Sequence, residues 1–107
     1  MSAEPRTDQP AVTLQDVHEF APRIRSVVEK HKGTGRVLVF GSVARGTSTV
    51  ESDIDLLVEF LPEASYFDLI AAQDELTAVI GTRVDVVSLR AQGRAADHAR
   101  AQAIELL

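Results

Sequence analysis

Two aspartates in one strand-like segment carry the strongest chemical signal in this sequence. Asp53 and Asp55 alternate with the apolar residues Ile54, Leu56 and Val58. Because successive side chains of a strand point to opposite faces, both carboxylates should lie on one face. Two carboxylates held roughly 6–7 Å apart repel each other unless a cation lies between them. Mg²⁺ takes oxygen ligands, commonly one or two carboxylates together with substrate phosphates, so the pair predicts a metal-nucleotide site.

A glycine-serine turn precedes this pair and offers a place for a phosphate. Gly41 leaves room for an anion to approach the backbone, and Ser42 supplies a hydroxyl donor. Residues 43–45 are predicted to begin a short helix whose free N–H groups point at the anion. Arg45 supplies a planar cation for phosphate, or it pairs with an internal carboxylate. The alternative for Ser42 is an ordinary turn residue.

A third carboxylate, Asp85, lies among the valines Val84, Val86 and Val87. An aspartate in a strand of this kind is costly unless it is paired or ligates a metal. If its strand lies beside that of Asp53 and Asp55, the three carboxylates converge on one edge of a sheet. Such a cluster can hold two metal ions for an in-line nucleotidyl displacement, with Asp85 as a ligand and proton acceptor. The alternative is a surface residue or an ion-pair partner.

The elements that must position these residues alternate between helix and strand. Helices are predicted over residues 14–32, interrupted at Pro22, over residues 66–80, and over an alanine-rich segment from 91 to 107. Strands are predicted over residues 36–40, 53–60 and 83–89.

Several single residues carry further expectations about these elements. Thr13 with Asp16 and Ser65 with Asp68 are expected to cap the first two helices. Gly33 is expected to supply a left-handed cap to the first of these helices, and Gly81 to end the second. Inward positions in the second helix are expected at Leu69, Ile70, Leu76, Val79 and Ile80, and Tyr66 and Phe67 are interpreted as core. Three apolar residues of the C-terminal helix, together with those of the first helix, are candidate docking surface: Ile104, Leu106 and Leu107.

Composition narrows the class of protein. The 107 residues are 45% hydrophobic and 25% charged, which predicts one domain over residues 12–107 behind a flexible tail over residues 1–11. A net charge of −5 argues against a long nucleic-acid-binding face. The sequence has no cysteine, no apolar run approaching ~20 residues and no signal-peptide pattern at its start, so we expect a cytoplasmic protein.

Taken together, Gly41-Ser42, the Asp53-x-Asp55 pattern ten residues later and Asp85 resemble the polymerase-beta-type nucleotidyltransferase superfamily. The segments around them are similar to its smallest branch, the minimal nucleotidyltransferase (MNT) proteins, closely over residues 36–89. The resemblance implies an α/β (α+β) fold with a small mixed sheet and helices on one face, use of ATP and Mg²⁺, and transfer of AMP. Many MNT proteins that resemble this chain are antitoxins encoded beside an HEPN-domain ribonuclease toxin, whose tyrosine they adenylylate. The alanine-rich C-terminal segment with Gly93 departs from the pattern.

Three functions remain open at this point. The first is a nucleotidyltransferase that adenylylates a protein partner, with an HEPN toxin as the leading candidate. The second is an antitoxin that only occludes the toxin; the intact set of Asp53, Asp55 and Asp85 favours the first over it. The third is a small-molecule nucleotidyltransferase. A chain of 107 residues offers no second domain to enclose a small acceptor, which favours a protein acceptor.

Overall fold

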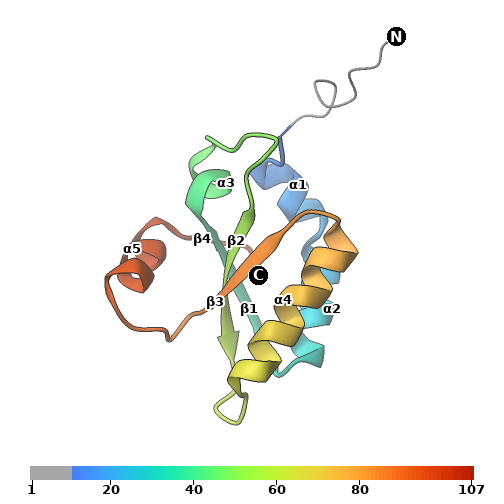
Figure 1. Ribbon diagram of the computed structural model, residues 1–107, viewed down its shortest axis with the longest axis vertical. Helices are drawn as coiled ribbons and strands as arrows, with labels where there is room; N and C mark the ends of the chain where they lie inside the picture. The colour runs from blue at the N-terminus through green and yellow to red at the C-terminus, as the bar shows by residue number, and fades with distance from the viewer. Residues whose placement is uncertain (1–10) are drawn as a thin grey trace.

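A four-stranded mixed sheet forms the centre of the protein (Figure 1). The computed structural model describes residues 11–107, so the predicted tail over residues 1–11 lies, apart from Ala11, outside the described residues. The strands are β1 (Gly33–Phe40), β2 (Ile54–Phe60), β3 (Val84–Ser88) and β4 (Ile104–Glu105). The helices are α1 (Leu14–Glu19), α2 (Ala21–Lys30), α3 (Gly41–Arg45), α4 (Tyr66–Ile80) and α5 (Arg94–Gln102).

The strand order is β3-β2-β1-β4, with β2 and β3 parallel and the other two pairs antiparallel. The parallel pair is connected by α4, as a parallel pair requires a crossover. The turn between antiparallel β1 and β2 contains α3 and the polar loop that follows it. This topology confirms the predicted α/β fold with a small mixed sheet. None of the helices in the described part of the chain is long and apolar enough to cross a membrane.

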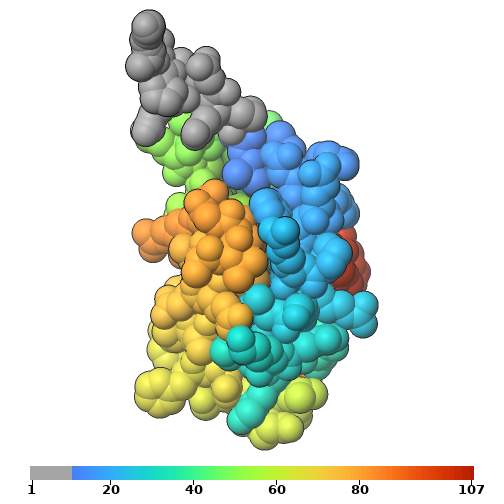
Figure 2. Space-filling view, turned by 90° about the vertical axis from the view of Figure 1, so that its right-hand side faces the viewer, coloured from blue at the N-terminus to red at the C-terminus, as the bar shows by residue number. Residues whose placement is uncertain are grey.

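The core lies between one face of the sheet and the helices α2 and α4. Alternate residues of β2, namely Ile54, Leu56, Val58 and Phe60, belong to this core together with residues of both helices. Figure 2 shows α2 and α4 side by side over this face. Figure 1 shows α5 on the other side of the sheet, so the expected arrangement with helices on one face holds for α2 and α4 but not for α5. The period of two in the strand therefore sends Asp55 to the face away from α2 and α4.

The first helical region is divided as predicted. Pro22 occupies the first turn of α2, where its missing N–H costs nothing, and Phe20 joins the two helices. The capping pair of α1 is confirmed: the Thr13 hydroxyl accepts from the Asp16 N–H at 3.2 Å, and the Asp16 carboxylate accepts from the Thr13 N–H at 3.0 Å. At the start of α4 the Asp68 carboxylate accepts from the Ser65 N–H at 2.7 Å, which confirms the second capping pair, and Gly81 ends α4 with φ +85°.

The prediction that Gly33 supplies a left-handed cap was wrong. Lys32 adopts the positive φ of 70°, and Gly33 is already the first residue of β1. Glycine is needed at position 33 for another reason: a Cβ there would lie 2.7 Å from the Val28 carbonyl oxygen. The close approach of β1 to the end of α2, rather than the backbone dihedral, therefore accounts for this residue.

Helix α4 is less buried at its ends than its sequence indicates. Leu76 is fully buried as expected, but Val79 is 39% exposed. The interpretation of Tyr66 and Phe67 as core was wrong, since they are 72% and 82% exposed. Both lie in the first turn of α4, and hydrophobicity alone does not bury a side chain at such a position.

The prediction of a single helix over residues 91–107 was also wrong. Helix α5 begins only after Gly93, which has φ +114°, and ends at Gln102. The chain then forms β4 along the free edge of β1, where Ile104 lies opposite Val39. Unpaired backbone groups along that edge are satisfied better by a strand than by continuing the helix.

Consequently the three apolar C-terminal residues do not form a helical docking surface. Leu106 and Leu107 pack against the core, and their N–H groups both donate to the Val37 carbonyl, at 2.9 and 3.0 Å. Ile104 is 38% exposed. The candidate docking surface of Ile104, Leu106 and Leu107 is therefore withdrawn.

Candidate functional site

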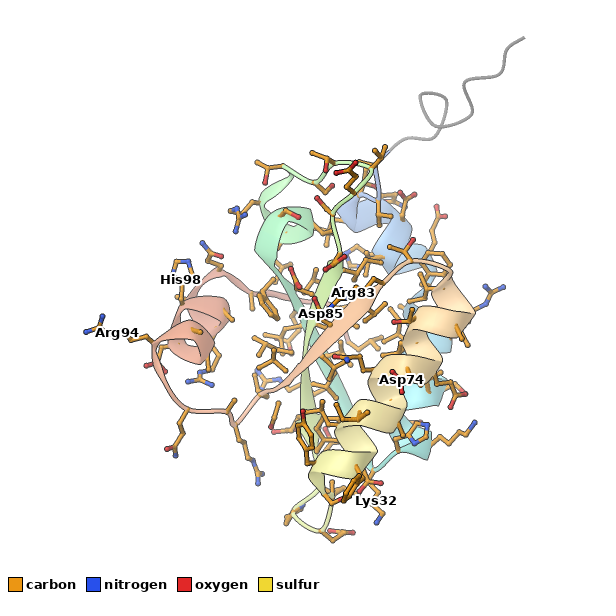
Figure 3. All side chains as sticks on the ribbon, in the orientation of Figure 1. Lys32, Asp74, Arg83, Asp85, Arg94 and His98 are labelled. Atoms are coloured by element: carbon orange, nitrogen blue, oxygen red, sulfur yellow. The ribbon has the colours of Figure 1, made fainter. Side chains whose placement is uncertain are left out.

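The register between β2 and β3 brings two of the predicted site residues together. Asp55 lies directly opposite Asp85 in this parallel pair, so both carboxylates project from the same face. Asp53 precedes the first residue of β2 by one position. Figure 3 shows Asp85 beside Arg83 on β3, on the side of the sheet that faces away from α4. The structure thus places all three predicted carboxylates at one end of the β2–β3 pair.

The surroundings of Asp55 oppose its ionisation. The pKa of Asp55 rises from 3.8 to about 6, first because burial removes water from the carboxylate and then because the charges of Asp85 and Asp53 repel it. The nearby Arg45 opposes this rise and lowers the pKa in part. A carboxylate with this surrounding is destabilised as an anion and would be stabilised by an added cation.

Gly41 connects the turn to this group of carboxylates. Its φ is +75°, and a Cβ on it would lie 2.3 Å from Oδ2 of Asp55. The Asp55 carboxylate therefore rests against the backbone at the start of α3, in a position that any other residue at 41 would obstruct. Two independent reasons therefore require glycine at position 41: its positive φ and the carboxylate that lies beside it.

Ser42 and Arg45 both belong to α3, which confirms the predicted short helix after the turn. The Thr47 N–H donates to the Ser42 carbonyl at 2.9 Å, and Gly46 ends the helix with φ +77°. Arg45 donates from Nη1 to Oε1 of Gln102 at 3.2 Å, so its guanidinium joins α3 to α5. Contact of Gly41, Ser42 and Arg45 with a nucleotide remains a prediction.

Sequence reasoning missed one charged residue of the site, Arg83. Its Nε lies 3.4 Å from Oδ1 of Asp85 and 3.7 Å from Oδ2 of Asp53, so one guanidinium contacts carboxylates from two neighbouring chain segments. A signal was available, because Arg83 precedes Asp85 by two positions and a strand period of two directs both side chains to one face. What the sequence alone could not show is that Asp53 reaches the same guanidinium.

The chemistry of these donors fits a divalent cation of the Mg²⁺ type. Carboxylate oxygens are the ligands that such ions prefer, and Asp53 and Asp85 keep 37% and 34% of their side-chain surface exposed for an incoming ion. Within residues 11–107, no three such side chains close tightly enough to surround an ion by themselves. Mg²⁺ commonly completes its coordination with water and substrate phosphates, so an open carboxylate edge suits it.

A separate hollow of about 480 Å³ lies at α1, the start of α2 and the end of α4. Its lining includes Phe20, Arg23 and Ile80, and none of the three carboxylates belongs to it. The residues with the chemistry of a metal site therefore lie on an open edge of the sheet and not in this hollow.

Comparison with known proteins identifies relatives over most of the chain. The family model described as Polymerase beta, Nucleotidyltransferase matches residues 23–107. A candidate protein adenylyltransferase of Methanocaldococcus jannaschii, MJ0435, is 40% identical over 73 residues, which are 68% of this chain and 77% of the relative. Protein adenylyltransferase MntA of Thermococcus cleftensis is 32% identical over 76 residues, 71% of this chain and 77% of the relative.

Solved structures share the fold. A candidate minimal nucleotidyltransferase superposes with a TM-score of 0.72 at 34% identity, over 87% of this chain and 95% of the other. The complex of a tri-AMPylated Shewanella oneidensis HEPN toxin with its MNT antitoxin contains a chain with a TM-score of 0.63. That chain is 18% identical to this one, with 88% of this chain and 72% of the other covered, so the likeness concerns the fold alone.

Proposed function

This chain belongs to the polymerase beta nucleotidyltransferase family, and from that premise we propose that it transfers AMP from ATP to a hydroxyl group of a partner protein. The acceptor we propose is a tyrosine of an HEPN-type toxin, which the transfer would inactivate, so that this chain acts as its antitoxin. The relatives described above are named as protein adenylyltransferases, which supports this reaction. The HEPN toxin bound to an MNT antitoxin of the same fold supports the partner.

One observation carries the proposal: the Asp55 carboxylate rests against the backbone of Gly41 and is close enough to Asp53 and Asp85 for their charges to act on it. This arrangement joins a turn that can accept phosphate to a set of oxygen ligands that can hold a cation. Each part alone is common in proteins. Their contact at one end of the sheet is what a metal-dependent transfer from a nucleoside triphosphate requires.

The residues have distinct proposed roles. Asp53, Asp55 and Asp85 would hold Mg²⁺, which, when bound, neutralises the triphosphate and makes the acceptor hydroxyl more acidic. Gly41, Ser42 and Arg45 would bind the phosphates. In the transfer, the acceptor oxygen forms a bond to the α-phosphorus, the bond to pyrophosphate breaks, and Asp85 accepts the hydroxyl proton.

The test is to mix the purified chain with the neighbouring HEPN-type protein, ATP and Mg²⁺, and to measure the mass of that protein. We expect additions of about 329 Da, the mass of one AMP residue, on a tyrosine. Asp85→Asn should retain most of the ATP affinity and lose transfer, because a proton acceptor acts mainly in the transition state. The double variant with Asp53→Asn and Asp55→Asn should lose Mg²⁺-dependent ATP binding.

A toxin that is fully inhibited but keeps its original mass would contradict the proposal. That result would indicate that the chain inhibits the toxin by binding and covering it, and that the carboxylates catalyse no transfer of AMP to it. Transfer of AMP to small hydroxyl compounds but not to the toxin would instead support a small-molecule nucleotidyltransferase.

A further inference from the structure

We propose that Arg83 competes with the divalent cation for Asp53 and Asp85, and thereby sets how tightly the site binds metal. This inference rests on the proposed function, because it assigns a role to Arg83 in the same site. It is carried by the contacts of the Arg83 guanidinium with two of the three carboxylates.

The position of Arg83 is that of a counter-ion shared between two ligands. Its Nε lies 3.4 Å from Asp85 and 3.7 Å from Asp53, and Figure 3 shows it beside Asp85 at the same end of β3. The third carboxylate, Asp55, is the register partner of Asp85 and is repelled by both other aspartates. The positive charge of Arg83 therefore reduces the repulsion between Asp53 and Asp85.

A metal ion would need the same oxygens. Carboxylates that coordinate Mg²⁺ direct their lone pairs at the ion, and a guanidinium in contact with those oxygens opposes a second cation by charge and by space. An ion that takes the oxygens facing Arg83, Oδ2 of Asp53 and Oδ1 of Asp85, displaces the guanidinium from them. Binding of the ion therefore includes the cost of separating Arg83 from these two residues.

The arginine is also free to leave. Its side chain is 72% exposed, so it can rotate into water without opening a cavity. Exposed ion pairs contribute only about 0.2–1 kcal/mol each, which makes the exchange readily reversible. Two such pairs correspond to roughly a twofold to thirtyfold effect on metal affinity.

The experiment measures Mn²⁺ binding to the full chain in the absence of nucleotide, by titration with detection of free Mn²⁺ by electron paramagnetic resonance. We expect Arg83→Gln to bind Mn²⁺ roughly twofold to thirtyfold more tightly than the wild type. Arg83→Lys should lie between them, because it keeps the charge but lacks the planar fork that can contact both carboxylates. The difference between Arg83→Gln and wild type should shrink at high KCl concentration, because salt screens the exposed pairs.

The matched control is Arg25→Gln, which removes the same charge from an exposed ion pair with Glu29 on α2. It should leave Mn²⁺ affinity unchanged. Equal or weaker Mn²⁺ binding by Arg83→Gln would overturn the competition while leaving the metal site intact. Failure of the wild type to bind Mn²⁺ in any carboxylate-dependent way, judged against the double variant with Asp53→Asn and Asp55→Asn, would overturn the metal site and this inference with it.

Discussion

At the scale of single residues, Asp55 is the side chain on which the rest of the site depends. Its carboxylate rests against Gly41, lies opposite Asp85 and has a pKa raised to about 6 by burial and by the neighbouring negative charges. The folded protein therefore bears a cost when Asp55 is ionised. A residue that lowers stability and is suited to bind a cation is typical of a functional site.

This cost predicts a pH-dependent effect of Asp55→Asn. The pKa of Asp55 is higher in the folded protein than the unfolded value of 3.8, so the folded state binds more protons than the unfolded state between about pH 4 and 6. The free energy of unfolding of the wild type therefore falls as the pH rises through that window. Without divalent metal, Asp55→Asn should therefore match the wild type near pH 4 and exceed its free energy of unfolding by about 1–2 kcal/mol at pH 8. Urea unfolding at the two pH values measures this.

The control for that prediction is Asp74→Asn, which removes an exposed aspartate from the outer side of α4 (Figure 3). The difference in free energy of unfolding between Asp74→Asn and the wild type should be the same at pH 4 and pH 8. A constant difference between Asp55→Asn and wild type at both pH values would show that the Asp55 carboxylate bears no charge-dependent cost.

At the scale of elements, the junction between β1 and α3 determines where the carboxylates of the next strand can lie. Gly41 and Gly46 bracket α3 with nearly the same backbone conformation, at φ +75° and +77°. They differ in their surroundings: a Cβ at 41 would collide with Asp55, whereas a Cβ at 46 would meet nothing within 4 Å. Substitution of Gly46 therefore measures the cost of the dihedral angle alone, whereas substitution of Gly41 measures that cost together with the cost of the collision with Asp55.

We predict that Gly46→Ala lowers the free energy of unfolding by about 1 kcal/mol, through the left-handed conformation alone. Gly41→Ala should cost at least about 1 kcal/mol more and should also weaken Mg²⁺-dependent ATP binding, because the Asp55 carboxylate must move. Urea unfolding and calorimetry of both variants provide the comparison. Equal losses of stability with unchanged ATP binding would show that the contact between Gly41 and Asp55 has no role in the site.

At the scale of the whole molecule, the two faces of the sheet differ: one packs against α2 and α4, whereas the other carries the site carboxylates at one end and the buried Leu57 further along β2. Residues such as Leu56, fully buried against the helices, alternate along β2 with Asp55 on the opposite face. One strand therefore contributes both to the core and to the site. Changes to the carboxylates should alter function without loss of the fold.

We expect Leu56→Ala to lower the free energy of unfolding by about 2–5 kcal/mol, since it leaves a cavity in the core. A triple variant in which Asp53, Asp55 and Asp85 are all changed to Asn should still fold. At pH 8 without divalent metal, its free energy of unfolding should be at least equal to that of the wild type. It should nevertheless fail to transfer AMP. Circular dichroism, urea unfolding and the mass measurement on the toxin test both variants. An unfolded triple variant would show that the carboxylates are needed for the structure itself.

Local patterns in the sequence were sufficient for much of this protein. The alternation around Asp55, the capping pairs at Thr13 and Ser65 and the break at Pro22 depend on neighbours within a few positions, so their structural consequences could be read directly. The family resemblance, based on the turn and the three aspartates, was equally a property of the sequence and is confirmed by the match over residues 23–107.

Tertiary structure decided what depends on partners distant in the chain. The C-terminal residues formed β4 because the edge of β1, more than sixty positions earlier, offered unpaired backbone groups. Gly33 was required by the carbonyl of Val28 and not by its own dihedral angle. Arg83 joined the site because the β2–β3 register brings Asp53 within its reach. Local periodicity determines which face a side chain takes, but only the packing of strands determines which charges meet there.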